Sequence, residues 1–256
     1  MTLAACAALV ERGDPDRFLA TMAALPEDRD RLWPLYAFNL EVARAPWASA
    51  ERLIGEMRLQ FWADVLDDIG QGAPARAHEV ARPLAELVRA EALPLAPLRG
   101  MVAARRRDLE PSAPEDAATL WAYLEATGGA LAGQAARALG ADEAVAAVAG
   151  EAGAAAAMAS WLVAVPALAA RGRRPLPEAP ERLAAEALER LARARARPAA
   201  RGVPRRVLPA FWAGWRAGAL LRLAVREPAR VAEGRLVQAE FARRGGLLWR
   251  SLAGLW

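Results

Sequence analysis

Residues 35–68 read LYAFNLEVARAPWASAERLIGEMRLQFWADVLDD, and this stretch decides the fold. Two segments of helical hydrophobic periodicity flank Ala45-Pro46, where the proline is expected to end the first helix. Apolar residues cover most of the circumference of the first segment, namely Leu35, Tyr36, Phe38, Leu40, Val42 and Ala43. A helix that is apolar nearly all round is enclosed by other elements, so we expect this one in the core.

Each segment also carries a polar side chain where an apolar one is expected. Asn39 lies in the apolar arc of the first segment, where its amide needs hydrogen-bond partners. Arg58 falls within the apolar stripe of the second segment, where a guanidinium needs a carboxylate or a ligand. That stripe consists of Ile54, Leu59, Phe61, Trp62, Val65, Leu66 and Ile69. Two interpretations stay open: an internal polar network with Glu41 or Asp108, or the wall of a ligand pocket.

The composition indicates an all-α fold. Of the 256 residues, 55% are hydrophobic and 25% are charged, as in globular proteins. Ala, Leu and Arg are abundant, and no run of β-branched or aromatic residues alternates with a period of two. No repeat or long linker divides the sequence, so we expect a single domain over residues 1–256.

Capping residues and prolines mark where the helices begin and end. Asp14-Pro15 is typical of an N-cap followed by proline at the first helical position, and Leu25-Pro26 ends that helix. Ser49 is expected to cap the helix that runs to about residue 69. Further helices are predicted over residues 78–90, 94–108, 114–139, 143–170, 180–197, 207–225 and 236–256.

Residues 152–170 carry no charge, so a transmembrane span has to be weighed against a buried central helix. Alanine is nearly neutral for membrane insertion and Pro166 interrupts the segment, which favours the buried helix. Its small side chains predict close packing by neighbouring helices, or room for a ligand.

The charged residues, Cys and His exclude several classes of protein. The net charge is only +4, and aromatic and basic residues do not alternate, so we expect no nucleic-acid partner. The single Cys6 and single His78 exclude a disulfide framework and a Cys/His metal cluster. The N-terminus lacks a basic region before its apolar stretch, so we expect no secretory signal and a reducing, cytoplasmic location.

Short motifs follow one another in a fixed order along nearly the whole chain. They are Arg17-Phe18, Leu25-Pro26, residues 35–38, Arg107-Asp108-Leu109, Tyr123 with Gly128, Gly133 and Gly140, and residues 172–177 after the Ala-rich segment. In this order and spacing the chain resembles the squalene/phytoene synthase family. The resemblance implies an isoprenoid-synthase-like helical bundle around a central cavity.

Enzymes of that family join two prenyl diphosphates, whose charge is neutralised by Mg²⁺ held on two aspartate-rich motifs. The positions of the first motif fall here on Ala43, Arg44 and Trp47, and those of the second on Ala164 and Leu168. The resemblance therefore implies a catalytically degenerate homologue without catalytic residues, metal ligands or a cofactor.

Other patterns resemble a non-synthase branch of the family, namely residues 38–43, residues 55–62 and Val165-Pro166. The best-known members of that branch are assembly factors for mitochondrial respiratory complex I, with relatives in bacteria. This resemblance implies a pseudoenzyme that acts as a binding or assembly factor in respiratory complex I biogenesis, near the bacterial inner membrane.

Two alternative functions remain. One is an active prenyl diphosphate transferase of isoprenoid biosynthesis that uses Glu41, Asp64 and Asp68 with Mg²⁺. The other is an isoprenoid or lipid carrier that keeps the cavity without its chemistry.

The candidate binding residues are the polar and aromatic positions expected around such a cavity: Tyr36, Asn39, Glu41, Arg58, Gln60, Trp62, Arg107, Asp108 and Tyr123. Asp64 and Asp68 have the i, i+4 spacing of a metal-binding pair, but they share the polar side of their helix with Glu56. We therefore interpret them as solvated acids paired with Arg, and keep the metal pair as a weaker alternative.

Two segments near the C-terminus are candidates for contact with a partner. The connector 198–206 and the residues before it are rich in Arg, with Arg193, Arg195, Arg197, Arg201, Arg205 and Arg206. The last segment carries Leu247, Leu248, Trp249, Leu252, Leu255 and Trp256. We expect a solvated linker and a packed helix, with peripheral membrane contact as the alternative. The remaining partners we expect are a protein of a respiratory assembly or an isoprenoid or lipid ligand.

Overall fold

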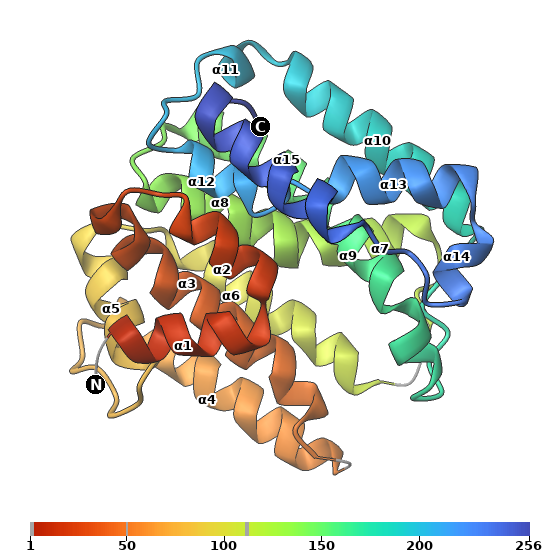
Figure 1. Cartoon of the computed structure of the whole chain (residues 1–256). Helices are drawn as coiled ribbons and strands as arrows, with labels where there is room; N and C mark the ends of the chain where they lie inside the picture. Colours follow the sequence, from red (N-terminus) through yellow and green to blue (C-terminus); the bar gives the residue numbers. More distant parts are fainter. Residues whose placement is uncertain (1–2, 50, 111–112) are drawn as a thin grey trace.

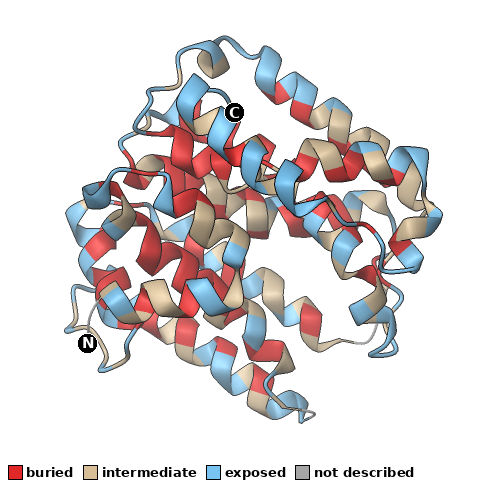
Figure 2. Ribbon diagram, in the orientation of Figure 1, coloured by how far each residue is buried: buried red, intermediate tan, exposed pale blue. Residues whose placement is uncertain are grey.

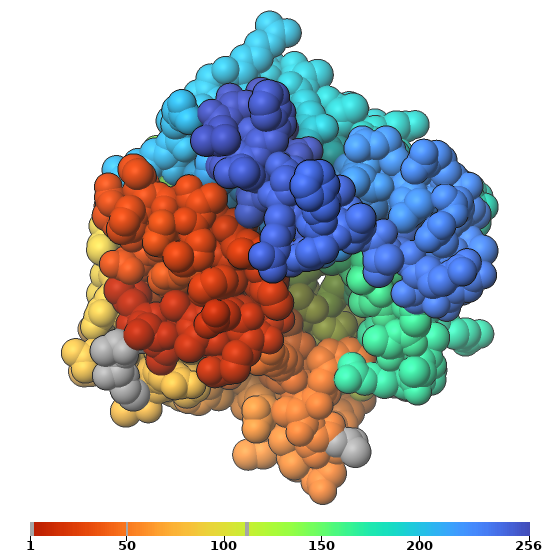
Figure 3. Space-filling model, in the orientation of Figure 1, coloured from red at the N-terminus to blue at the C-terminus, as the bar shows by residue number. Residues whose placement is uncertain are grey.

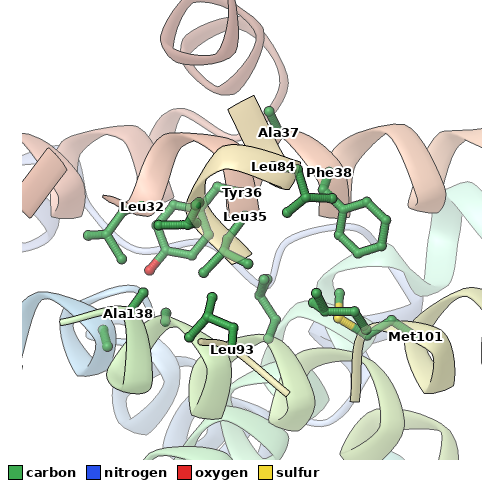
Figure 4. Packing of buried hydrophobic residues seen from close by; sticks show 14 of the residues in the cluster. Leu32, Leu35, Tyr36, Ala37, Phe38, Leu84, Leu93, Met101 and Ala138 are labelled. Carbon is green, nitrogen blue, oxygen red and sulfur yellow. The ribbon is translucent and has the colours of Figure 1, made fainter. Parts of the chain in front are cut away.

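Helix α3 (Pro26–Arg44) runs through the core of the N-terminal half of the computed structural model, which describes residues 3–49, 51–110 and 113–256. All residues from 32 to 40 are buried, so the enclosure predicted for this helix is confirmed. Figure 4 shows Tyr36 and Phe38 of α3 among Leu84, Met101 and Ala138, which come from three other helices. The N-terminal helices are thus arranged around α3.

The regular elements of the described residues are all helical, which confirms the predicted all-α class. The elements around α3 are α1 (Leu3–Gly13), α2 (Pro15–Met22), η1 (Ala45–Trp47), α4 (Arg52–Gly70), α5 (Ala81–Ala90), α6 (Leu95–Arg105) and η2 (Arg106–Leu109). The later elements are α7 (Ala117–Leu124), η3 (Glu125–Gly129), α8 (Ala130–Ala138), α9 (Glu143–Ala169), α10 (Pro180–Ala196), α11 (Pro198–Arg201), α12 (Leu208–Trp212), α13 (Ala217–Arg226), α14 (Ala229–Ala232) and α15 (Glu240–Ala253).

The Ala-rich helix α9 is central, as its sequence predicts. Figure 1 shows α8 and α9 in the middle of the molecule, with α1–α6 on one side and α10, α13 and α14 on the other. Helix α9 contacts α8, α10, η3 and α13, and Figure 2 shows buried residues gathered where the helices face one another. Among the described helices it is the one that is long and apolar enough to cross a membrane.

Glycines allow α9 to approach its neighbour closely. The long helix predicted over residues 114–139 forms as α7, the π-helical turn η3 and α8. A Cβ atom at Gly153 of α9 would lie 2.8 Å from the carbonyl oxygen of Gly128 in η3, and one at Gly129 would lie 3.0 Å from the carbonyl oxygen of Gly150. Side chains at these positions would push the two elements apart, so the close packing predicted for this helix is confirmed.

Several helix boundaries differ from the sequence-based expectations, and α5 and α7 each begin three residues later than predicted. Helix α4 begins at Arg52, and the Ser49 hydroxyl accepts a hydrogen bond from the backbone N–H of Glu51 in the preceding turn, at 3.1 Å. The helix predicted over 207–225 is interrupted between α12 and α13 at Gly214, which lies against Ala156 of α9 and weakens a helix intrinsically. The last helix starts at Glu240, four residues later than predicted.

A buried polar network joins α6, η2 and α7. The Tyr123 hydroxyl donates to the Asp108 carboxylate at 2.8 Å, and the Arg105 guanidinium donates to the same oxygen at 3.2 Å. Arg173, in the turn after α9, donates to the backbone carbonyls of Asp108 and Glu110. The network therefore fixes the junction at which the two halves of the molecule meet.

We expect Asp108→Asn to lower the free energy of unfolding by about 2–3 kcal/mol, because the partly buried Arg105 guanidinium loses its counter-charge. The matched control is Asp64→Asn, whose exposed pair with Arg76 is worth less than about 1 kcal/mol. Urea denaturation of both variants measures the difference. Equal losses in the two variants would show that the network is not a structural junction.

Candidate functional site

A cavity of about 220 Å³ lies between α9 on one side and α2, α3, α12 and α13 on the other. The α9 wall is made of small residues, among them Ala149, Ala152, Gly153, Ala156 and Ala157. These residues leave space because their side chains are small. Both features predicted for the Ala-rich helix, close packing and room for a ligand, are therefore present. Most of the cavity wall is apolar.

One end of the cavity is polar, and its charged side chains form hydrogen bonds and ion pairs with one another. The Asp14 carboxylate caps α2 by accepting the backbone N–H of Arg17 at 2.9 Å, and it also pairs with the Arg17 guanidinium. The Asp16 carboxylate pairs with the guanidinium groups of Arg216 and Arg243. Arg243 also pairs with Glu240, so the charges of the paired side chains at this end balance.

Three buried donors at this end have no hydrogen-bond partner among the described residues. They are the Tyr36 hydroxyl and the Nε atoms of Arg17 and Arg216. Tyr36 is 1% exposed, and the Arg17 guanidinium carbon lies 5.3 Å from its ring centroid. Burial raises the pKa of Tyr36 to about 12, so its hydroxyl keeps its proton at neutral pH. Donors without partners are costly in a protein interior, and all three belong to residues that line the cavity.

The C-terminal segment covers this region of the molecule. The Trp215 indole donates to the carbonyl of Arg243 at 3.0 Å, and the Trp212 indole donates to the carbonyl of Leu255 at 2.8 Å. Trp256 itself lines the cavity, with its ring 4.4 Å from that of Phe211. Figure 3 shows α15 lying across the face of the molecule, with a hollow below it in this view.

Only Tyr36, of the nine residues predicted to bind a ligand, lines this cavity. Asp108 and Tyr123 are brought together, but in the buried network with Arg105 rather than in the cavity. Asn39 is buried as expected, yet its amide forms no hydrogen bond with the described residues, so the predicted network with Glu41 or Asp108 is wrong for Asn39.

Arg58 is exposed, which contradicts its placement within an apolar stripe. The buried stripe of α4 is narrower than predicted, with Leu59, Trp62, Val65, Leu66 and Ile69, and Arg58 lies at its edge. Arg58, Glu41 and Trp62 do lie together, around a small surface pocket that also includes His78. This pocket is separate from the central cavity.

Gln60 and Arg107 also lie away from the cavity, beside a shallow surface pocket. The Gln60 amide donates to Asp64 at 2.6 Å and its carbonyl accepts from Arg106 at 2.9 Å. The Arg107 guanidinium donates to the carbonyl of Ala113 at 3.3 Å. The sequence placed Gln60 on the polar side of its helix, and that side faces solvent.

The acids proposed as a weak metal pair are paired with Arg instead. Arg76 binds the Asp68 carboxylate at 2.6 Å and lies 3.7 Å from the Asp64 carboxylate. Among residues 3–49, 51–110 and 113–256, no three Asp, Glu, His or Cys side chains are grouped so that they could hold a metal ion. The donor set therefore does not fit a Mg²⁺ cluster, and the chemistry of the site has to be derived from its own side chains.

Sequence reasoning missed the residues that form the polar end. Asp14 was identified as a helix cap and Arg17 as part of a motif, but neither was named as a binding residue. The Asp14-Pro15-Asp16-Arg17 spacing, with three charges in one helical turn, is the signal that points to them. Arg216 lies about 200 residues away and has no local signal.

Comparison with known proteins places this architecture in a family. The family model for squalene/phytoene synthase matches residues 10–208. Over the full chain, a dehydrosqualene synthase crystal structure covers 98% of this chain and 95% of its own, with a TM-score of 0.77 and 15% identity. A squalene synthase from Alicyclobacillus acidocaldarius covers 89% of this chain and 94% of its own, with a TM-score of 0.74 and 17% identity. At such low identity these structures show the fold alone.

Sequence relatives carry a different description. A bovine protein described as NADH dehydrogenase (ubiquinone) complex I, assembly factor 6 is 31% identical over 122 residues, which are 48% of this chain and 36% of that protein. A Drosophila melanogaster homologue of that factor is 35% identical over 107 residues, which are 40% of this chain and 32% of its own. The match thus spans about a third of the length of these relatives. Because the family model extends over most of the residues described here, the chain belongs to the squalene/phytoene synthase family.

Proposed function

We propose that this chain is a ligand-binding assembly factor that uses the family's cavity without synthase chemistry, in the biogenesis of respiratory complex I. The observation that carries the proposal is the set of three unpartnered donors at the polar end of an apolar cavity. Such a site suits a molecule with an acceptor head group and an apolar chain.

The ligand class follows from the side chains of the cavity. The unpartnered groups of Arg17, Tyr36 and Arg216 can each donate a hydrogen bond, which suits a phosphate or carbonyl oxygen. The small apolar residues of α9 suit a hydrocarbon chain. An isoprenoid or another lipid with an oxygen-rich head has both properties, so a carrier role is compatible with the assembly role.

The transferase alternative has less support. Trp47 stands at one position of the first aspartate-rich motif, and the guanidinium carbons of Arg171 and Arg173 lie 4.9 and 5.0 Å from its ring centroid. Ala43 and Ala164 have no charge to offer at other motif positions. The motif positions named here offer no carboxylates to hold divalent ions. The negative charge of two bound diphosphates would then not be neutralised, which makes the transferase the weaker proposal.

The assembly role rests on the names of the relatives, which are complex I assembly factors. We propose that the protein works in the bacterial cytoplasm, at the periphery of the inner membrane, where it meets a protein of the respiratory assembly.

Contact with the membrane would use the outward side of α15. Phe241, Leu248, Trp249 and Leu252 are 91%, 59%, 66% and 69% exposed on this helix. Aromatic and aliphatic side chains beside arginines are typical of interfacial helices.

The cavity predicts a specific binding result. Isothermal titration of farnesyl diphosphate should show the same affinity in EDTA and in Mg²⁺, because the donors belong to the protein. Tyr36→Phe should weaken binding about tenfold through loss of one hydrogen bond, and should leave the free protein as stable or slightly more stable, because an unsatisfied hydroxyl is removed.

Tyr123→Phe is the matched control, since Tyr123 is the other tyrosine of the chain and its hydroxyl is partnered. It should lower stability and leave the affinity unchanged. Binding that requires Mg²⁺, or turnover of the diphosphate, would establish the transferase instead. If the folded wild-type protein shows no measurable binding, the ligand-binding part of the proposal is wrong.

The assembly role predicts a selective respiratory defect. Deleting the gene in the source organism should reduce NADH oxidation by isolated membranes several-fold and leave succinate oxidation unchanged, because succinate enters after complex I. A plasmid copy of the gene should restore the NADH rate. An unchanged NADH rate, or an equal fall in both rates, would contradict a role in complex I biogenesis.

The membrane contact predicts loss of vesicle binding in a double variant of α15. Trp249→Ser with Leu252→Ser should reduce co-sedimentation with phosphatidylglycerol vesicles by about tenfold or more, since each buried apolar side chain contributes roughly 1.5–3 kcal/mol. The control pair is Leu53→Ser with Met57→Ser, which are similarly exposed on α4. Equal vesicle binding by the wild type and the α15 variant would rule out this surface.

A further inference from the structure

The part of α9 that lines the central cavity is long. It runs from Ala149 to Val163, a span of about 21 Å at 1.5 Å per residue. The volume of the cavity is about 220 Å³. An engineered apolar cavity of about 150 Å³ encloses a benzene ring, so this one has room for about nine carbon atoms. Such a small volume over such a length describes a channel about as wide as one hydrocarbon chain.

The two ends of this channel differ. At one end Ser160 and Val163 are exposed, so the channel opens to solvent there. At the other end Ala149 and Ala152 are buried in the same apolar cluster as Phe211. The buried end therefore offers apolar contacts to a chain that enters from the open side.

Apolar wall separates the donors of the polar end from the buried end of the channel. Gly214, two residues before Arg216, lies against Ala156, since a Cβ atom at Gly214 would be 2.7 Å from the Cβ atom of Ala156. Along α9, Ala156 is about 10 Å from Ala149 at 1.5 Å per residue. A chain attached to a head group at Arg216 thus has about that length of apolar wall available.

Trp256 is an aromatic side chain at the buried end. Its ring centroid is 4.4 Å from that of Phe211, and the Arg195 guanidinium carbon lies 5.4 Å from the same centroid. The Trp212 indole donates to the carbonyl of Leu255 at 2.8 Å, which holds the backbone before Trp256 in place. Arg195 lines the channel and is exposed, so the channel comes close to the surface beside this ring. Removing the ring would therefore lengthen the channel toward solvent.

We propose that Trp256 limits the length of the hydrocarbon chain that the cavity accepts, an inference that rests on the proposed ligand-binding function. The ligand is a single-chain amphiphile whose head group meets the donors of the polar end and whose chain points toward Ala149. Each carbon inside the channel leaves water and adds affinity. A carbon beyond the position of Trp256 finds no further apolar wall and adds none, so the ring sets the limit.

Titration calorimetry with n-alkyl phosphates from butyl to dodecyl, each below its micellar concentration, tests this limit. The affinity of the wild type should rise about fourfold with each added carbon and stop rising at a chain of about nine carbons. In Trp256→Ala the rise should continue past that length. Dodecyl phosphate should then bind this variant about tenfold or more tightly than it binds the wild type, and butyl phosphate should bind both alike.

Three other variants separate the limit from general effects on binding. Leu255→Ala is the matched control, because Leu255 adjoins Trp256 but is 52% exposed and does not line the channel, so its limit should be that of the wild type. Ala152→Val narrows the channel at the buried end and should shorten the limit, which keeps the inference testable where Trp256→Ala folds poorly. Tyr36→Phe should weaken binding of every chain length by the same factor and leave the limit in place.

The results distinguish failure of the limit from failure of the binding site. A limit that stays at the wild-type length in Trp256→Ala and in Ala152→Val, or one that moves as far in Leu255→Ala, overturns the role of Trp256. Wild-type affinity that still rises up to dodecyl phosphate does the same, since the site then exists without the limit. If the folded wild type binds no member of the series, the ligand-binding function is itself wrong and the length limit falls with it.

Discussion

The close approach of α9 to η3 is the constraint on which the rest of the structure depends. At Gly128 and Gly153 two backbones lie almost in contact, and side chains there would have no space. This contact fixes α9 at the centre of the bundle, and α10, α12 and α13 pack on its remaining sides. The same run of small residues that allows the contact also forms the cavity wall. Packing and ligand space thus have one origin, in the alanine and glycine content of a single helix.

Arginine side chains line the polar end of the cavity. Its polar end contains arginines whose aspartate partners leave Nε donors free. Guanidinium groups keep their charge at any physiological pH and are oriented here by α2 and by the start of α13. A site of this kind can hold an oxygen-rich head group. This arrangement of donors is the basis of the proposed ligand-binding role.

The sequence was a good guide to elements that are decided locally. The enclosure of α3, the Asp14 cap and the extent of α9 follow from periodicity, capping chemistry and composition, and the structure confirms them. The prediction that Arg58 lies within the apolar stripe of α4 was wrong, because ideal helical periodicity does not determine how wide the packed face of a helix is. Arg216 could not be predicted, since it pairs with Asp16 from about 200 residues away in the sequence. Only the tertiary fold brings such residues together.

Helix α15 makes few buried contacts with the rest of the molecule, and this affects how fast a ligand could exchange. Leu247 is the one buried residue of this helix, and its other anchors are the pairing of Arg243 with Asp16 and the indole hydrogen bonds of Trp212 and Trp215. Local opening of such a segment requires far less free energy than global unfolding. Detachment of the last helix would therefore open a route by which a molecule beneath Trp256 could leave. Residence time in the cavity is then a property of the C-terminus, and it can change without any alteration of the binding residues.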